Sequence, residues 1–424
     1  MHVFWRALSG LVAPTDWIQI SLFGSILALT LAAAPATAAQ PPERPQEEPV
    51  DTQGDSGEES PVSFDKAPGS ALQIHGFAVA GYTYDVETQD NTFDTSVFAL
   101  SVYRPLLDNR LSFFGQLTVH RPETEVFAFE EHEEGLEGLE GEEGHGAGGD
   151  EVETEIDNLL IRWAAKPQAG LDLTFGKFDS PLAIERDDAP LNYQATPSFL
   201  LDHGRPIKFT GVMVHEAFSP RFEGFAILAN GEDVTPDNNH GKTGALYGRW
   251  SPSLASHLGL GVIYGDQEKD LARTTAVATL LLQPRPSWVF GGEAVSGRQE
   301  RLEASGTDRW SGAMLFVHHR FDRGFGPASQ WAGTVRAEVL EDTDGRRTGA
   351  PQTVTSLTLS PQYLVGGGFY GIFHFLEGTS LRLPQLAVRL DLRWDHSDEE
   401  VFAGSGEELS QDHYSANFQV VFVF

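Results

Sequence analysis

The sequence predicts an all-β protein, a transmembrane antiparallel β-barrel of sixteen strands, and three observations lead to this fold class. Extended segments of about ten residues, the length of a tilted strand that crosses a membrane, follow one another from residue 71 to the C-terminus. Many of them alternate between apolar and polar residues, which places the two kinds on opposite faces of a strand. Short connections also take turns with long polar ones, as expected for tight turns at one rim of a barrel and longer loops at the other.

The composition excludes several other classes of protein. The chain of 424 residues has no cysteine, which excludes disulfides, thiol nucleophiles and cysteine-bound metals. Lys and Arg number 29 against 61 Asp and Glu, and the formal net charge of -32 argues against binding to nucleic acid. No G-x-S-x-G, H-E-x-x-H or phosphate-binding glycine motif is present, so we expect no enzymatic activity.

Two N-terminal segments precede the expected barrel. An apolar run over 17–39 ends in small residues, with A-T-A at 36–38 as the cleavage motif, so we interpret 1–39 as a secretory signal peptide. An uncleaved membrane anchor is the alternative, because the run is long enough to cross a bilayer. Residues 40–70 are acidic and rich in Pro, Ser and Gly, with few large apolar groups. We expect them to be a disordered periplasmic leader.

The barrel domain is expected to span 71–424. Its predicted strands are 72–85, 92–104, 110–128, 152–165, 171–178, 207–218, 221–230, 243–251, 256–266, 273–283, 287–299, 308–320, 330–342, 352–364, 382–395 and 412–424. Sixteen is an even number, as single-chain bacterial barrels require. The long apolar connection 365–385 has room for two more strands, so an eighteen-stranded barrel is the alternative.

Two of these strands show the alternation clearly. In 110–120 the odd-numbered residues are apolar and the even-numbered ones mostly polar, whereas in 414–424 the even-numbered residues are apolar or aromatic. An exported chain with such strands is either a water-soluble sandwich or a barrel that turns its apolar faces to lipid. The alternation of short and long connections favours the barrel.

The C-terminal residue Phe424 ends the last predicted strand. In a closed barrel this strand pairs with the first one, because an open edge in lipid leaves backbone groups without partners. The aromatic ring is then expected at the interface with outer-membrane lipid and lipopolysaccharide. A C-terminal strand that ends in Phe also resembles the signal by which outer-membrane proteins contact the barrel-insertion machinery.

Two segments, 175–214 and 230–246, carry a further pattern of glycines, prolines and polar residues. In the first it consists of Gly176, Lys177, Phe178, Pro181, Glu185, Pro190, Asn192, Tyr193, Ser198, Thr210, Gly211 and Val212. In the second it consists of Asn230, Gly231, Asp233, Asp237, Asn238, Asn239, Gly241, Lys242 and Thr243. In these residues the chain resembles the OmpL-like β-barrel porins. The resemblance implies a channel in the outer membrane of a Gram-negative bacterium, with no cofactor and no reaction.

The connection 179–206 is the expected constriction of this channel. A long ordered connection inside a compact fold is usually functional, and charges of both signs in a lumen sort solutes by charge. The candidate residues are Glu185, Arg186, Asp187, Asp188, Asp202, His203 and Arg205, together with Lys208, Arg162 and His120 from the strands. A surface lid stabilised by its own apolar residues is the alternative.

The connection 129–151 is expected to be an acidic outer loop. Carboxylates bind hard divalent cations, and imidazoles add affinity for zinc or copper. The candidate ligands are His132, His145, Glu133 and Glu134. Abundant glycine leaves them without a fixed geometry, so we predict a solvated loop with at most loosely bound divalent cations.

The expected function is therefore that of an outer-membrane porin that lets small hydrophilic solutes or ions diffuse passively through a water-filled barrel. A barrel-anchored surface protein that binds divalent cations through the acidic loop is the alternative. The strand pattern suits a monomer and a homotrimer equally. The solute and the sign of its charge stay open at this point.

Overall fold

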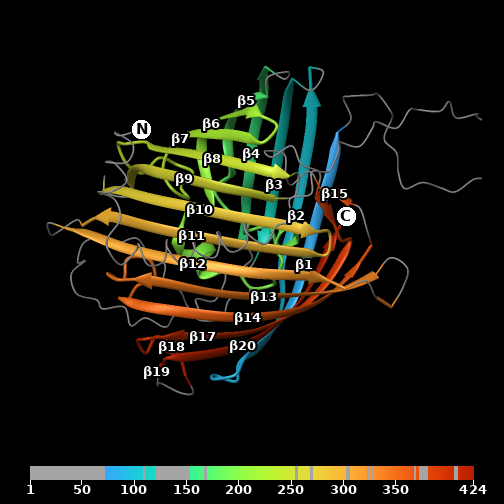
Figure 1. The fold of residues 1–424 in the computed structure, drawn as a ribbon, viewed down its shortest axis with the longest axis vertical. Coiled ribbons are helices and arrows are strands. Elements are labelled where there is room, and N and C mark those ends of the chain that lie inside the picture. The colour runs from blue at the N-terminus through green and yellow to red at the C-terminus, as the bar shows by residue number, and fades with distance from the viewer. Residues whose placement is uncertain are drawn as a thin grey trace, which may run out of the picture. The chain divides into compact units, whose positions relative to one another are not determined.

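The computed structural model of the chain is a closed ring of antiparallel strands (Figure 1). It describes residues 72–107, 110–120, 153–166, 170–253, 256–267, 271–301, 306–321, 324–325, 329–366, 369–371, 381–404 and 409–424. The predicted signal peptide 1–39, the leader 40–70 and the acidic loop 129–151 lie outside these residues. Among the described residues, no helix is long and apolar enough to span a membrane.

The ring consists of sixteen strands, and each corresponds to one of the predicted segments. They are β1 (Gln73–Asp85), β2 (Asn91–Leu106), β3 (Leu111–His120), β4 (Glu153–Lys166), β5 (Leu171–Asp179), β6 (Lys208–Ser219), β7 (Phe222–Ala229), β8 (Thr243–Ser253), β9 (Ser256–Gln267), β10 (Leu271–Arg285), β11 (Trp288–Glu300), β12 (Thr307–Arg320), β13 (Ser329–Asp342), β14 (Gln352–Val365), β17 (Leu386–Ser397) and β20 (Asp412–Val423). The predicted fold class is confirmed.

Among the described residues, four short strands lie outside the ring. β15 (Phe369–Gly371) pairs with β16 (Leu381–Leu383) in the connection between β14 and β17, and β18 (Phe402–Ala403) pairs with β19 (Leu409–Ser410) before β20. Strands of two or three residues are far too short to cross a membrane. The eighteen-stranded alternative is therefore wrong, because the ring closes with sixteen strands and β15 and β16 pair with each other.

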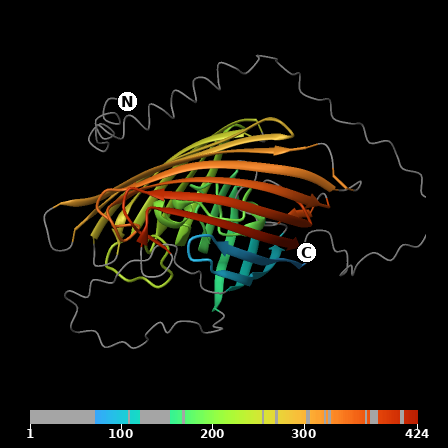
Figure 2. The ribbon, with the colours of Figure 1, turned by 90° about the horizontal axis from the view of Figure 1, so that it is seen from below.

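The first and last strands close the ring. β1 pairs with β20 from Phe77↔Val423 to Asp85↔Ser415, and Figure 2 shows the two strands side by side near the C-terminus. The pairing extends to the last residue, because Gly76 and Phe424 exchange backbone hydrogen bonds of 2.9 and 3.0 Å. The aromatic ring of Phe424 lies 6.1 Å from that of Phe98 on β2. The last residue of the chain is thus held by the backbone of β1 and packs beside a ring of β2.

Outward and inward faces alternate along the strands. On β17, Leu390 and Leu392 point outward and are exposed, whereas Arg389 and Asp391 point into the ring and are buried. Inward faces of β13 and β14 are polar in the same way, with residues such as Arg336, Glu338, Thr358 and Ser360. This part of the barrel has the apolar exterior and polar interior that the alternation predicts.

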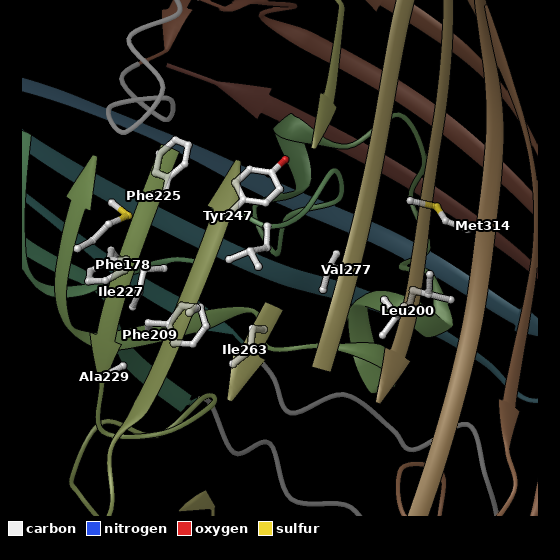
Figure 3. Close-up of a cluster of buried hydrophobic side chains, with 14 of the residues drawn as sticks. Phe178, Leu200, Phe209, Phe225, Ile227, Ala229, Tyr247, Ile263, Val277 and Met314 are labelled. Atoms are coloured by element: carbon white, nitrogen blue, oxygen red, sulfur yellow. The ribbon is translucent and has the colours of Figure 1, made fainter. Parts of the chain in front are cut away.

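The inward face from β5 to β12 carries a cluster of apolar residues among its polar ones, and the alternation did not indicate this cluster. Figure 3 shows Phe178, Phe209, Phe225, Ile227, Ala229, Tyr247, Ile263, Val277 and Met314 from these strands in one cluster with Leu200. Leu200 and Leu182 belong to the connection between β5 and β6, and both are completely buried in the cluster. This cluster of inward apolar residues on β5 to β12, which we call the apolar arc, therefore provides the surface on which the connection between β5 and β6 packs.

The connection 180–207 lies within the ring. It contains two short helical turns, η2 (Ala189–Leu191) and η3 (Leu200–Gly204). η3 contacts β11 and β12, and η2 contacts β20. Because these strands lie on different sides of the ring, the segment crosses the interior, and we call residues 180–207 the inner loop.

Candidate functional site

The inner loop is hydrogen-bonded to β17 through two inward side chains. Asp391 accepts bonds from the backbone N–H of Ala195, and from the backbone N–H and the hydroxyl of Thr196, each 2.9 Å long. Arg389 donates to the carbonyl oxygens of Asn192 at 2.8 Å and Ala189 at 2.9 Å. The carboxylate of Asp391 thus accepts from backbone N–H groups of the loop, and the guanidinium of Arg389 donates to its backbone carbonyls. Together they satisfy polar backbone groups of the loop that have no partner in a sheet.

β13 holds the next part of the inner loop. Arg336 donates to the carbonyl oxygens of Thr196 and Pro197 at 2.8 Å and forms an ion pair of 2.8 Å with Glu185. Glu338, whose carboxylate lies 3.1 Å from the Nε of Arg336, accepts a bond of 2.7 Å from the N–H of Phe199. These charged side chains are almost completely buried, so each requires the partners that it has.

A third buried connection runs to β11. Arg205 forms an ion pair with Glu293, and both side chains are essentially inaccessible to water. Glu293 also accepts a bond of 2.9 Å from the N–H of Ile184, and Arg205 donates to the carbonyl of Glu185 at 3.1 Å. One carboxylate therefore joins the beginning and the end of the inner loop to the barrel wall.

Apolar contacts also fix the loop against β9 and β12. A Cβ atom at Gly261 of β9 would lie 2.6 Å from Leu182, and one at Gly312 of β12 would lie 3.0 Å from Leu200. Any larger residue at Gly261 would require Leu182 to move. The absence of a side chain at these two positions creates space for the two leucines of the inner loop.

Lys208, the first residue of β6, lies among carboxylates. Its Nζ is 2.8 Å from Asp157, 2.9 Å from Asp179 and 2.6 Å from Asp187. These acids come from β4, the end of β5 and the inner loop. One ammonium group is therefore shared by three carboxylates, and we call these four residues with Asp188 the Lys208 cluster.

Asp188 is connected to the same cluster through Gln116 of β3. The amide of Gln116 donates to Asp188 at 2.7 Å and to Asp157 at 2.9 Å. Burial raises the pKa of Asp188 well above its ordinary value of 3.8, and the neighbouring charges of Asp187 and Asp157 raise it further. The carboxyl of Asp188 thus keeps its proton at a higher pH than an exposed aspartate does.

The two segments of the sequence pattern meet at Lys208. Asp233 lies in the connection between β7 and β8, and its carboxylate accepts bonds of 2.8 Å from the backbone N–H groups of Ile207 and Lys208. The N–H of Asp233 donates in turn to the carbonyl of Lys208 at 3.2 Å. The pattern residue Asp233 therefore fixes the start of β6 and, with it, the position of the lysine.

The connection between β13 and β14 covers the end of the inner loop. Arg347 donates to the carbonyl of His203, and its guanidinium lies 5.2 Å from the ring of Trp310. The indole N–H of Trp310 donates to the carbonyl of Gly204 at 2.9 Å. Burial, with Arg347 nearby, lowers the pKa of His203 to about 4, so this imidazole is neutral at neutral pH.

Arg162 belongs to a separate group of charges nearer the rim with the short turns. It pairs with Asp172, and His215 lies between Asp172 at 3.3 Å and Glu223 at 2.9 Å. Glu223 also pairs with Arg249 at 2.6 Å. Arg162 is five positions from Asp157 along β4, or roughly 16 Å, so the structure does not bring it to the Lys208 cluster.

The other candidate residues differ in their surroundings. In the inner loop Asp187 and Asp202 are exposed, whereas Glu185, Arg186, Asp188 and Arg205 are buried and His203 is half-buried. His120, on β3, lies 4.0 Å from Glu155. The candidate metal ligands His132, His145, Glu133 and Glu134 lie outside the described residues. In the part of the chain that is described, no group of acidic or histidine side chains is arranged to hold a metal ion.

Five residues that hold the inner loop were not predicted from the sequence: Glu293, Arg336, Glu338, Arg389 and Asp391. A signal for four of them exists, because charges alternate with apolar residues along 330–342 and 386–397. Such alternation indicates charges that point into a barrel. The alternation contains no information about which distant segment these charged side chains bind.

Comparison with protein families finds a match over residues 133–424 to the family described as "Putative beta-barrel porin-2, OmpL-like".

Among solved structures, the anion-selective porin from Comamonas acidovorans has a TM-score of 0.54 at 10% identity, over 84% of this chain and 100% of that one. OmpT of Vibrio cholerae, an outer membrane protein in its trimer form, has a TM-score of 0.51 at 11% identity, over 84% and 100%. The outer membrane channel DcaP of Acinetobacter baumannii has a TM-score of 0.50 at 11% identity, over 85% and 99%. At such identities the likeness shows the fold alone. No curated protein matches the chain.

Proposed function

Because the chain belongs to the OmpL-like porin family of bacterial outer-membrane β-barrels, we propose that it is a channel through which small hydrophilic solutes or ions diffuse passively. The observation that carries this proposal is the inner loop, which crosses a closed ring of sixteen strands and is hydrogen-bonded to its inward face. A loop fixed in a lumen narrows it to a defined size. The inner loop is thus the proposed constriction, with the Lys208 cluster at its side.

The chemistry of the interior supports diffusion of polar solutes in particular. Inward hydroxyl, amide and carboxylate groups, such as those of Thr83, Asn417 and Asp187, provide hydrogen-bond partners along a passage for water. The apolar arc does not oppose the diffusion of polar solutes, because the inner loop packs on the arc. Polar solutes are therefore the proposed cargo.

Planar-bilayer recording of the full chain, purified in detergent, tests the channel. We expect stepwise increases in current as single channels insert, and swelling of liposomes that contain the protein in solutions of small sugars. A protein that is folded, as judged by a change in electrophoretic migration on boiling, yet adds no current would contradict the proposal.

A homotrimer is the proposed assembly, since the Vibrio cholerae protein of the same fold is described in a trimer form. Light scattering of the detergent-solubilised protein, corrected for bound detergent, measures its mass. A mass of three chains is expected. A mass of one chain would exclude the trimer without affecting the proposed channel.

A further inference from the structure

The interior of the ring contains charges of both signs, but they differ in their access to water. A buried charge that is paired with an opposite one contributes little to the potential along a passage, whereas a charge that faces water acts directly on a passing ion. The preference of the channel for cations or anions therefore depends on which charged side chains remain exposed.

The arginines under the inner loop are withdrawn from water. Arg336 and Arg389 are almost completely buried and donate to carbonyl oxygens of the loop. Each also has an inward acid two positions along its own strand, Glu338 on β13 and Asp391 on β17. The positive charges of these strands hold the loop and are balanced locally.

The arginine of the inner loop nearest β11 is balanced as well. Arg205 is buried in its pair with Glu293. Farther toward the short turns, Arg162 and Arg249 alternate with Asp172 and Glu223 around His215. The two guanidinium and the two carboxylate charges of this group offset one another.

The exposed charges of the inner loop are acidic. Among residues 180–207, all of which are described, Asp187 and Asp202 are the two exposed ones. Asp187 belongs to the Lys208 cluster, in which one ammonium is shared by the carboxylates of Asp157, Asp179 and Asp187. Arg186, buried beside this cluster, donates to the carbonyl of Ser180 at 2.6 Å. The edge of the loop that faces water thus presents negative charge.

We infer that the channel prefers small cations to anions of the same size, because Asp187 and Asp202 are the charges that the inner loop presents to water. This inference rests on the proposed channel function and names the class of its preferred solute. The fold shared with an anion-selective porin does not oppose it, because at 10% identity the two proteins share their strands and not their lining.

Reversal potentials test the inference. The full chain is inserted in a planar bilayer between solutions of KCl that differ tenfold in concentration, and the voltage of zero current gives the permeability ratio of K⁺ to Cl⁻. We expect a ratio above roughly fivefold in favour of K⁺, because one fixed charge at about 4 Å in water changes the local concentration of a monovalent ion about fivefold and acts in opposite directions on K⁺ and Cl⁻. Higher salt on both sides should lower the ratio through screening.

A double variant, Asp187→Asn with Asp202→Asn, should bring the ratio close to one. The control is Glu216→Gln, which removes one acidic charge from the outward face of β6 and should leave the ratio unchanged. A wild-type ratio at or below one would overturn the inference while the measured current upheld the channel. Absence of current from folded protein would instead refute the channel, and the inference with it. If the double variant fails to fold, the sign of the wild-type reversal potential still decides whether the channel prefers cations.

Discussion

Leu182 of the inner loop occupies the space that a side chain at Gly261 would need, since a Cβ atom there would lie 2.6 Å from the leucine. Gly261→Ala should therefore displace the loop, at a cost of about 1–3 kcal/mol as expected for overpacking. Single-channel recordings should show noisier current of altered mean size. The control is Gly244→Ala, where the nearest atoms to a Cβ lie 3.8 and 3.9 Å away. Equal effects of the two variants would mean that the loop is not seated at Gly261.

Asp391 should keep the inner loop close to β17. In Asp391→Ala the N–H groups of Ala195 and Thr196 lose their acceptor, and each unsatisfied group costs about 1–3 kcal/mol. The loop should then leave the wall part of the time, which appears as flickering between conductance levels. Asp391→Asn keeps one acceptor oxygen and should flicker less. If Asn and Ala behave alike, the hydrogen bonds do not hold the loop.

Glu293 should be essential for the stability of the folded barrel because Arg205 has no access to water. Glu293→Gln leaves a buried guanidinium without its counter-charge and should cost about 3–5 kcal/mol. The temperature at which the electrophoretic migration of the folded form is lost should fall accordingly. Adding Arg205→Met to Glu293→Gln removes the stranded charge and should restore most of the loss. A double variant no more stable than the single one would show that the pair matters through shape and not charge.

The cation preference should increase with pH. The pKa of Asp188 is raised, so above its ordinary range the carboxyl still carries a proton and is neutral. As pH rises through the raised pKa the proton leaves and one more negative charge joins the Lys208 cluster. The K⁺/Cl⁻ permeability ratio should thus grow as pH rises through this raised pKa. Asp188→Asn should remove this growth, and an unchanged pH profile in that variant would assign the titration to another group.

Removal of Phe424 should impair assembly of the barrel. The last residue exchanges two backbone hydrogen bonds with Gly76 and lies beside the ring of Phe98. Deletion leaves the beginning of β1 without a partner in lipid, where an unsatisfied backbone group costs several kcal/mol. The fraction of folded protein in outer-membrane preparations should fall. Phe422→Ala, which removes an outward aromatic but keeps the pairing, should assemble better than the deletion.

The order and faces of the strands could be predicted from the sequence because they follow from local rules. Alternation along 414–424 identifies Phe418 and Phe422 as outward residues without knowledge of any partner. The hairpin of β15 and β16 limits this reasoning. Its apolar segments look like strands, and only their pairing with each other excludes them from the ring.

The candidate site could be predicted only in part. The segment 179–206 stands out by length and charge, and Asp187 and Lys208 do meet there. The roles of Glu293 and Asp391 depend on contacts between residues about one hundred and two hundred positions apart. No periodicity contains such information. For the same reason the burial of Glu185 and Arg205 could not be foreseen, since it results from what the loop meets across the ring.

The hydrogen bonds between Arg389 and the inner loop also have a bearing on biogenesis. Asn192 and Ala189 are synthesised about two hundred residues before the arginine that fixes them. A precursor inserted only as far as β12 would therefore have no wall on that side against which its loop could rest. The passage therefore has its final width only when β17 is part of the ring, and chains that end before β17 should form leaky channels.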